Sequence, residues 1–352
     1  MCYSVIYYML LPKRYCDLRL QLYCLTIIDK NKIMENNYVS SEIAVNELDD
    51  RIRSLRNRAT VENVDFEEEI EKLEKQKDEL FKKQFSNLAA YDIVKIARHP
   101  LRPSSIDYIS FMVDDFIELH GDRRFGDDKA IISGMGKIGN NKVMIIAQWK
   151  GKTTKERISC NFGMPNPEGY RKALLKMKLA EKYRIPIVTI IDTPGANPDI
   201  GAEERGQAQA IAENIHSMFM LKTPIISVVI GEGGSGGALG IGVCDKFSIL
   251  QYAYFSVISP EGCAAILWKH SKHADAAANA LKLTANDLYE HGIVDQIIPE
   301  PAGAANRSPK EMATALKEAL IKNIEELKDV PIDVLLENRY KKYRKIGAFF
   351  EN

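Results

Sequence analysis

Three short apolar runs follow one another in the middle of the chain, and a glycine lies in or just after the end of each run. The runs begin at Val143, Pro186 and Pro224 and have the sequences VMIIAQW, PIVTIIDTPGA and PIISVVIGEGG. Their apolar character is continuous rather than alternating, which is typical of strands that are covered on both faces. Between the second and third runs, residues 201–221 have the spacing of an amphipathic helix. The order strand–helix–strand predicts two parallel strands joined by a right-handed crossover.

These runs also predict that two glycine-bearing loops meet at one edge of a sheet. One loop spans residues 193–196 and the other spans residues 231–237. In open sheets with parallel strands, ligands bind beyond the carboxyl ends of the strands. We therefore place the candidate functional site where these two loops converge.

Residues 41–84 differ from the rest, because they are rich in Glu, Lys, Arg and Leu and contain neither proline nor glycine. Apolar positions recur at helical spacing on both sides of a weaker stretch, RATVENVDFEEE. These positions are Leu48, Ile52, Leu55, Ile70, Leu73 and Leu80. The pattern predicts two charged amphipathic helices, which could cover the domain, dock a partner, or do both.

The first 33 residues carry three of the six cysteines and do not fit either pattern. Their apolar run at residues 5–11 is too short to span a bilayer, and Pro12 and two basic residues interrupt it. No small-residue cleavage site follows an apolar core, so a signal peptide is disfavoured. We expect this stretch to be an upstream extension without a membrane anchor, and we expect Met34 to be the native start.

The bulk composition is that of an ordinary globular protein. Of the 352 residues, 45% are hydrophobic and 27% are charged, and the formal net charge is zero. A neutral balance gives no reason to expect binding to nucleic acid or to an anionic membrane. The cysteines form no C-x-x-C pair, which argues against a zinc ribbon. Free thiols in a reducing compartment, the cytoplasm, are the expectation.

The second glycine loop lies in the segment VVIGEGGSGGALG, residues 228–240, which fits three kinds of site. Gly231, Gly233 and Gly236 match the dinucleotide motif G-x-G-x-x-G, but the acidic residue that should follow about twenty positions later is ambiguous. Ser235 lies at the centre of a G-x-S-x-G nucleophile elbow, but no histidine falls in a loop expected near it. No Lys-Ser or Lys-Thr follows the glycines, which excludes a Walker A loop.

The third kind of site needs backbone amides alone. Gly236, Gly237 and Ala238 open the segment GGALGIGV, which we expect to be a buried helix. Amides at the start of a helix are unpaired and carry positive potential, and glycine lets the backbone approach a ligand closely. Such amides can stabilise an oxygen that gains negative charge, so an oxyanion-binding site is favoured. The other loop, at Gly195 and Ala196, is expected to shape the same pocket.

Four long segments resemble the alpha subunits of the carboxyltransferase of bacterial acetyl-coenzyme A carboxylase. They are NFGMPNPEGYRKAL, IDTPGANPDIGAEERGQAQAIA, VIGEGGSGGALGIGV and SVISPEGCAAILWK. The stretches ARHPLRPSSIDYI, ELHGDRRFGDDKAIISG and IVDQIIPEP extend the likeness, which covers residues 41–342. The first 33 residues fall outside it.

The resemblance implies an α/β fold of the crotonase-like type, a spiral of β-β-α units that includes parallel sheet. The strand–helix–strand order alone does not separate this fold from a doubly wound one. We expect four parts along the chain. They are an upstream extension at 1–33, a helical arm at 34–90, a carboxyltransferase domain at 91–342 and a C-terminal tail at 343–352.

The resemblance also implies a reaction and its partners. Carboxybiotin on a separate biotin carboxyl carrier protein gives its carboxyl group to acetyl-CoA, which yields malonyl-CoA in the first committed step of fatty acid synthesis. A carboxyltransferase beta subunit would complete the active site in an α2β2 tetramer. ATP would be used by a further component, biotin carboxylase, and no metal is expected in the alpha subunit.

Carried over by motif, the resemblance assigns the oxyanion donors on the biotin side to the amides of Gly237 and Ala238, with Gly236 in support. Three further residues of the two loops are expected to line the substrate site, namely Gly234, Gly195 and Ala196. A basic loop after the first strand carries Lys150 and Lys152. These compact cations could contact CoA phosphates, or they could simply be solvated.

Some positions depart from the pattern of the family. Asn197 and Asp199 stand where tyrosine and glycine are common, and Ser159 and Cys160 stand where basic residues are common. The stretch EPAGAANR is a variant of EPLGGAHR. The core glycines are intact, so we retain the activity. An assembly partner without chemistry and a stand-alone acyl-CoA hydratase or hydrolase stay open as alternatives.

Overall fold

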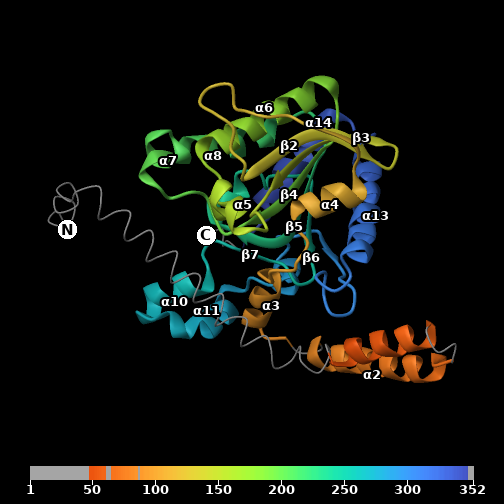
Figure 1. Ribbon diagram of the computed structural model, residues 1–352. Helices are drawn as coiled ribbons and strands as arrows, with labels where there is room; N and C mark the ends of the chain where they lie inside the picture. The colour runs from red at the N-terminus through yellow and green to blue at the C-terminus, as the bar shows by residue number, and fades with distance from the viewer. Residues whose placement is uncertain (1–46, 61–64, 86–87, 348–352) are drawn as a thin grey trace. The chain divides into compact units, whose positions relative to one another are not determined.

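The structure, a computed structural model, describes residues 47–60, 65–85 and 88–347 (Figure 1). The expectations about residues 1–33, and about the last five residues of the C-terminal tail, lie outside the described residues. The chain divides after residue 87 into two compact units.

The first unit contains the two helices that the apolar spacing predicts. They span residues 47–60 and α2 (Glu67–Phe85). Their buried apolar side chains form one small cluster of Ile52, Leu55 and Leu73. Two ion pairs also join the helices, from Arg56 to Glu74 at 2.7 Å and from Lys77 to Asp49 at 3.1 Å. The prediction of two helices is therefore confirmed, and the structure adds that they pack on each other.

The second unit is built on an eight-stranded sheet. Its strands are β1 (Asp114–Glu118), β2 (Ile131–Ile138), β3 (Asn141–Gln148), β4 (Ile187–Thr193), β5 (Ile225–Gly234), β6 (Lys246–Leu250), β7 (Tyr254–Ser256) and β8 (Gln296–Ile298). Their order is β1-β2-β3-β4-β5-β6-β8, and β7 pairs with β5 outside this path. The pairs β1–β2 and β2–β3 are antiparallel, and every pair from β3 onward is parallel.

The three apolar runs form the central strands β3, β4 and β5, as predicted. Proline precedes β4 and β5, where its missing N–H costs no ladder hydrogen bond. The carbonyls of Pro186 and Pro224 still join the ladder, since they accept hydrogen bonds from Met144 and Ile187 at 2.9 and 2.8 Å. Every residue of β4 and β5 is buried, which confirms strands covered on both faces.

Helices cover both faces of this sheet (Figure 1). The helices of this unit are α3 (Ala90–Ala97), α4 (Ser105–Met112), α5 (Thr154–Ser159), α6 (Pro167–Tyr183), α7 (Ile200–Glu204), α8 (Gln207–Met220), α9 (Ser235–Leu239), α10 (Pro260–Trp268), α11 (Ala274–Leu281), α12 (Ala285–Glu290), α13 (Pro309–Leu327) and α14 (Ile332–Arg344). The helix α6 packs on β2, β3 and α8, whereas α13 packs on β2, β5, β8 and α4. None of the helices in the described ranges is long and apolar enough to cross a membrane.

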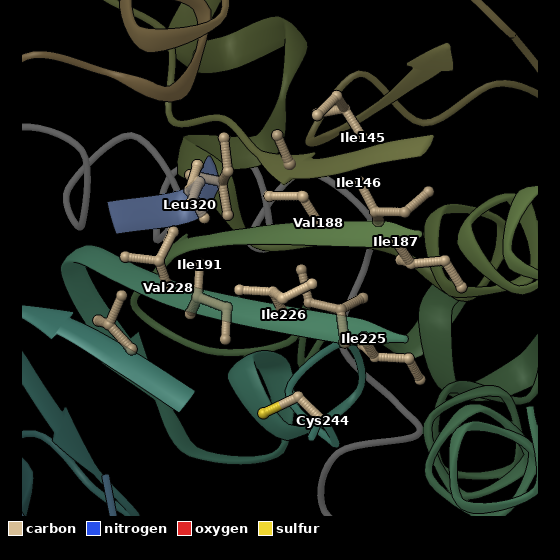
Figure 2. Packing of buried hydrophobic residues seen from close by; sticks show 14 of the residues in the cluster. Ile145, Ile146, Ile187, Val188, Ile191, Ile225, Ile226, Val228, Cys244 and Leu320 are labelled. Carbon is tan, nitrogen blue, oxygen red and sulfur yellow. The ribbon is translucent and has the colours of Figure 1, made fainter. Parts of the chain in front are cut away.

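The main apolar core lies around β4 and β5 (Figure 2). Figure 2 shows aliphatic side chains of these strands beside one another, among them Ile187, Val188, Ile191, Ile225, Ile226 and Val228. All six are fully buried. The strands that carry the two glycine loops are therefore held in the most densely covered part of the sheet.

Two helix expectations need correction. Residues 201–221 do not form one helix, because Gly206 adopts a left-handed backbone with φ of +83° and separates α7 from α8. Glycine takes this conformation without steric cost, so the chain can turn there. The segment GGALGIGV does not form a long buried helix either, since α9 ends at Leu239. Gly240 and Gly242 follow, and glycine is a poor helix former.

The C-terminal helix α14 is held by one buried arginine and continues through Arg344, two residues into the expected tail. Arg339 is fully buried and binds both carboxylate oxygens of Asp245 at 2.8 and 2.7 Å. Its remaining N–H groups donate to three carbonyls at 2.7–2.9 Å, those of Met218, Leu221 and Thr223. This single side chain therefore joins α14 to the end of α8 and to the segment that leads into β5.

We expect Arg339→Met to lower the free energy of unfolding by about 3–5 kcal/mol, because it leaves a buried carboxylate unpaired. Urea unfolding of the full chain measures the change. Lys341→Met on the same helix is the control, since its pair with Glu337 is exposed. That variant should stay within about 0.5 kcal/mol of the parent. Equal losses in the two variants would contradict the role given to Arg339.

Candidate active site

The two glycine loops lie in direct backbone contact, as the strand order predicts. A Cβ atom added to Gly237 would lie 2.4 Å from the carbonyl carbon of Gly195 and 2.5 Å from the amide nitrogen of Ala196. A Cβ atom added to Gly234 would lie 2.3 Å from the carbonyl oxygen of Pro194. Any side chain at these two positions would therefore force the loops apart.

The pairing of β4 with β5 is interrupted just before the loops begin. The ladder is regular up to Ile191 with Val229, and the next pair is Thr193 with Gly233. β5 thus advances four residues while β4 advances two. A bulge of this kind bends the strand and locally disrupts its ladder. Before the bulge β5 pairs with β6, and after it β5 pairs with β7.

Side chains satisfy the backbone groups that the bulge frees. The amide of Glu232 donates to a carboxylate oxygen of Asp192 at 2.9 Å. The carbonyl of Ile230 accepts a hydrogen bond from Nε of Arg102 at 2.7 Å. Between them, a Cβ atom at Gly231 would lie 2.6 Å from that same Asp192 oxygen, so only glycine fits this position.

Arg102 is itself held in a buried ion pair with Glu300. Both guanidinium nitrogens contact the carboxylate, at 2.6 and 3.0 Å. The same carboxylate accepts the backbone amides of Tyr252 and Ala305 at 2.9 and 2.8 Å. Such a fully hydrogen-bonded pair can be buried without an unpaired charge, so the bulge is supported from a loop far along the chain.

A second ion cluster lies beside the bulge, and Lys150 is at its centre. The Lys150 ammonium lies 2.6 Å from Oδ1 of Asp192 and 2.5 Å from Oε2 of Glu232. The other oxygen of Glu232 accepts hydrogen bonds from Arg98 and from the Tyr254 hydroxyl, both at 2.6 Å. Burial alone would raise the pKa of Glu232, but Lys150 and Arg98 hold that pKa well below its ordinary value. The carboxylate therefore stays ionised.

The expected contact of Lys150 with a CoA phosphate finds no support in this arrangement, because its ammonium is already paired with two carboxylates. Burial alone would lower the pKa of Lys150, but Asp192 and Glu232 raise that pKa above its ordinary value. Lys152 differs, since it is more than half exposed and pairs with Asp107 at 2.5 Å. A ligand contact of Lys152 stays a prediction.

Gln148, at the end of β3, joins both loop-bearing strands. Its side-chain amide donates to the carbonyl of Gly237 at 2.8 Å and accepts from the amide of Asp192 at 3.2 Å. The hydroxyl of Tyr170 donates to the same Gly237 carbonyl at 3.2 Å. Because a trans peptide is planar, the N–H of Ala238 points away from these two donors, toward the N-terminal side of α9.

The amides assigned from the sequence lie at that N-terminal side. Gly236 and Gly237 belong to the first turn of α9, where amides have no carbonyl partner within the helix. Ala238 is one position later, and its ordinary acceptor would be the carbonyl of the N-cap residue Gly234. The amide of Gly195 is already used, since it donates to the Thr193 hydroxyl at 3.1 Å.

Ser235 occupies the position of a nucleophile but has no base. Its φ of +50° is left-handed, a conformation that costs a residue other than glycine about 1–2 kcal/mol. Its side chain is exposed, and its hydroxyl makes no hydrogen bond to any residue in the described ranges. A serine nucleophile needs a histidine within hydrogen-bond reach, so the elbow lacks the group that would activate it.

Two of the four departures from the family pattern are buried structural residues. Cys160 is fully buried, and burial raises the pKa of its thiol to about 11, so it stays neutral. The side-chain amide of Asn197 donates to Oδ1 of Asn166 at 2.8 Å, and the backbone carbonyl of Asn197 accepts from Gln207 at 2.9 Å. Ser159 is exposed and donates to a carbonyl of its own helix. Neither Ser159 nor Cys160 offers a charge to a phosphate.

Several residues of this site were missed in the sequence because their partners are distant along the chain. Arg98, Asp192, Glu232 and Gln148 lie in three strand ends and one loop, and nothing local pairs them. One signal was present, since charged residues are rarely buried unless they are paired, and Asp192 and Glu232 each end an apolar run. Within the described residues, no three His, Cys, Asp or Glu side chains gather as a metal site requires.

Known proteins resemble this chain over most of its length. The protein called acetyl-coenzyme A carboxylase carboxyl transferase subunit alpha in Rhodopirellula baltica is 52% identical over 311 residues, which cover 88% of this chain and 97% of that protein. Its namesake in Geobacter metallireducens is 51% identical over 310 residues, with the same coverage of 88% and 97%. The namesake in Coxiella burnetii is 51% identical and covers 89% of this chain and 99% of that protein.

Solved structures with lower sequence identity share the fold. A transcarboxylase 12S structure superposes with a TM-score of 0.50 at 20% identity, over 62% of this chain and 42% of that one. A Pseudomonas malonate decarboxylase hetero-tetramer superposes with a TM-score of 0.51 at 15% identity, over 61% of this chain and 86% of that one. These likenesses confirm the crotonase-like α/β fold that the resemblance implied.

A family described as acetyl co-enzyme A carboxylase carboxyltransferase-like matches residues 38–347, which include the whole of the site described above. Both the family match and the relatives cover far more than half of the chain. The chain therefore belongs to the acetyl co-enzyme A carboxylase carboxyltransferase-like family.

Proposed function

We propose that this chain is the alpha subunit of an acetyl-CoA carboxylase carboxyltransferase and that its two glycine loops form an oxyanion-binding wall. The observation that carries this proposal is the direct backbone contact of Gly237 with Gly195 and Ala196. It sets the first-turn amides of α9 beside the loop at residues 193–196. The family to which the chain belongs supplies the reaction class, which is carboxyl transfer.

The shape of this surface fits a flat group that lies close to the backbone. A Cβ atom added to Gly195 would meet nothing within 4 Å, and one added to Gly236 would meet only Ile211 at 3.9 Å. Open space therefore lies beside Gly195, and a Cβ atom at Gly236 would make no more than an ordinary van der Waals contact. The biotin group of the carrier protein, when bound, supplies the carboxyl group that is transferred, and these two glycines leave room for it.

The chain itself contributes oriented donors. The amides of Gly236 and Gly237 have no acceptor within the helix, so they are available to an oxygen of the ligand. The amide of Ala238 becomes a third donor when its hydrogen bond to the carbonyl of Gly234 is broken. One such donor typically stabilises a transition state by about 3–4 kcal/mol. Gln148 and Tyr170 fix the peptide plane that carries the Ala238 amide.

The site described here is half of an active site. The two loops offer no titratable side chain with a free charge to the open space, since Lys150, Asp192 and Glu232 are paired with one another. We infer that a beta subunit supplies the surface for acetyl-CoA, in an α2β2 assembly in the cytoplasm. Biotin carboxylase would load the carrier protein with the carboxyl group at the expense of ATP.

Gly237→Ala tests the contact between the loops. The added methyl group would overlap the backbone of Gly195 and Ala196, so we expect the loops to separate. A misplacement of about 1 Å costs on the order of 100-fold in rate, and we expect a loss of that size. The measurement is malonyl-CoA-dependent carboxylation of biocytin by the chain mixed with its beta subunit.

Gly126→Ala is the matched control for this substitution. A Cβ atom at Gly126 meets nothing within 4 Å, and this glycine lies outside both loops. It should keep the parent activity. Full activity of the Gly237→Ala variant, with normal assembly, would remove the support for an oxyanion wall at this place.

Ser235→Ala separates the amide mechanism from a serine nucleophile. The substitution removes the hydroxyl and keeps every amide, so we expect kcat to change by less than about tenfold. A nucleophile would instead lose activity by a factor on the order of a thousand or more. The same biocytin assay, run at saturating malonyl-CoA, distinguishes the two outcomes.

A further inference from the structure

We infer that Lys150 is a positioning residue, which sets the spacing of the two glycine loops by holding Asp192 and Glu232 together without touching the substrate. This inference rests on the proposed function, because it concerns the same pair of loops. At this place a charged side chain sets the distance between two strands, which backbone hydrogen bonds set elsewhere in the sheet.

The three residues lie where three neighbouring strands end. Lys150 follows β3 by two residues, Asp192 is the last residue but one of β4, and Glu232 lies two residues before the end of β5. Asp192 directly precedes the loop at 193–196, and Glu232 lies at the start of the second loop, directly before Gly233 and Gly234. The Lys150 ammonium contacts both carboxylates, so one cation joins the starting points of both loops.

The ladder cannot set this spacing by itself. Backbone pairing of β4 with β5 stops at Ile191 and resumes only at Thr193. Within the gap, the amide of Glu232 is bonded to the Asp192 side chain instead of to a carbonyl. The position of that side chain therefore decides where the backbone of β5 lies, and Lys150 holds the side chain.

Removal of the ammonium would leave two carboxylates facing each other. Glu232 would keep Arg98 and Tyr254 on its other oxygen, whereas the Asp192 carboxylate would keep the amide of Glu232 and the charge of Arg102 but no direct ion pair. Like charges at this separation repel strongly where water is largely excluded. We expect Asp192 to turn outward, which would take away the acceptor of the bulge amide.

The stem of Lys150 is also linked to the first loop indirectly, through Gly163. A Cβ atom at Gly163 would lie 2.5 Å from Cγ of Lys150, so the lysine stem packs tightly on this glycine. The carbonyl of Gly163 accepts the hydroxyl of Thr193 at 2.7 Å, and Thr193 opens the loop. Lys150→Met keeps most of the stem and removes only the charge, so it isolates the electrostatic part.

The experiment uses the full chain assembled with its beta subunit. For Lys150→Met we expect kcat of malonyl-CoA-dependent biocytin carboxylation to fall on the order of 100-fold, as expected for misplaced donors. KM for malonyl-CoA should stay within about twofold, because no ligand contact is lost. Hydrogen exchange of the free chain should become faster at residues 193–196 and 231–238. Lys150→Arg, which keeps the charge, should restore most of kcat and the protection.

Lys172→Met is the matched control, because Lys172 is also buried and also pairs with a carboxylate, that of Asp127 at 2.6 Å. It lies on α6 and contacts neither glycine loop. We expect it to lower the thermal midpoint while kcat stays within about threefold of the parent. Faster exchange should then appear near residues 120–128 and not at the two loops.

The outcomes separate the alternatives. An unchanged kcat in Lys150→Met would overturn the inference, and a raised KM with unchanged kcat would overturn it in favour of a direct contact with CoA. If Lys150→Met does not fold, Lys150→Met with Glu232→Gln removes the repulsion; a loss of kcat and of protection is still expected, because no ammonium then holds the Asp192 side chain. Parent activity in that double variant would contradict the role.

If the unmodified chain shows no carboxylation with its beta subunit, the proposed function fails, whereas the exchange data still test the spacing of the loops.

Discussion

The break in pairing between β4 and β5 is the feature on which the rest of the site depends. Up to Ile191 the two strands are held by an ordinary parallel ladder in the core. Beyond it, β5 leaves β6, pairs with β7 and delivers its glycines against the loop that follows β4. A sheet without this bulge would keep both loops in register with the ladder, and the contact of Gly237 with Gly195 would be lost.

Buried ion pairs hold the two strands together where their backbone ladder stops. Two ion clusters flank the bulge, one centred on Lys150 and one on the pair of Arg102 with Glu300. Each of their carboxylates also accepts a backbone amide or a tyrosine hydroxyl. Buried ion pairs contribute little net stability, because desolvation offsets their attraction. These ion pairs fix the positions of the residues around the bulge, because a hydrogen-bonded pair has one arrangement whereas an apolar contact has many.

The sequence predicted the strands and loops of the site well, but it did not predict which charged residues pair with one another. Continuous apolar runs, two of them led by proline, identified β3, β4 and β5, and the glycines after them identified the loops. The single crossover helix was wrong because Gly206 breaks it, and a glycine inside a helical pattern is ambiguous without the fold. The pairing of Arg98 with Glu232 joins residues 134 positions apart, so no local pattern contains it. For the same reason the sequence suggested only a CoA phosphate or solvent beside Lys150, because the two carboxylates that it contacts come from other strands.

A site made of backbone amides has an evolutionary consequence that a site of side chains does not. Substitution changes side chains, and among the standard residues only proline removes an N–H. At Gly234 and Gly237 even a methyl group would collide with the backbone of the opposite loop. An inhibitor that bound chiefly through these amides would therefore leave the protein few single substitutions by which to escape it. Resistance would have to arise at a distance, in residues such as Gln148 that orient the peptide planes.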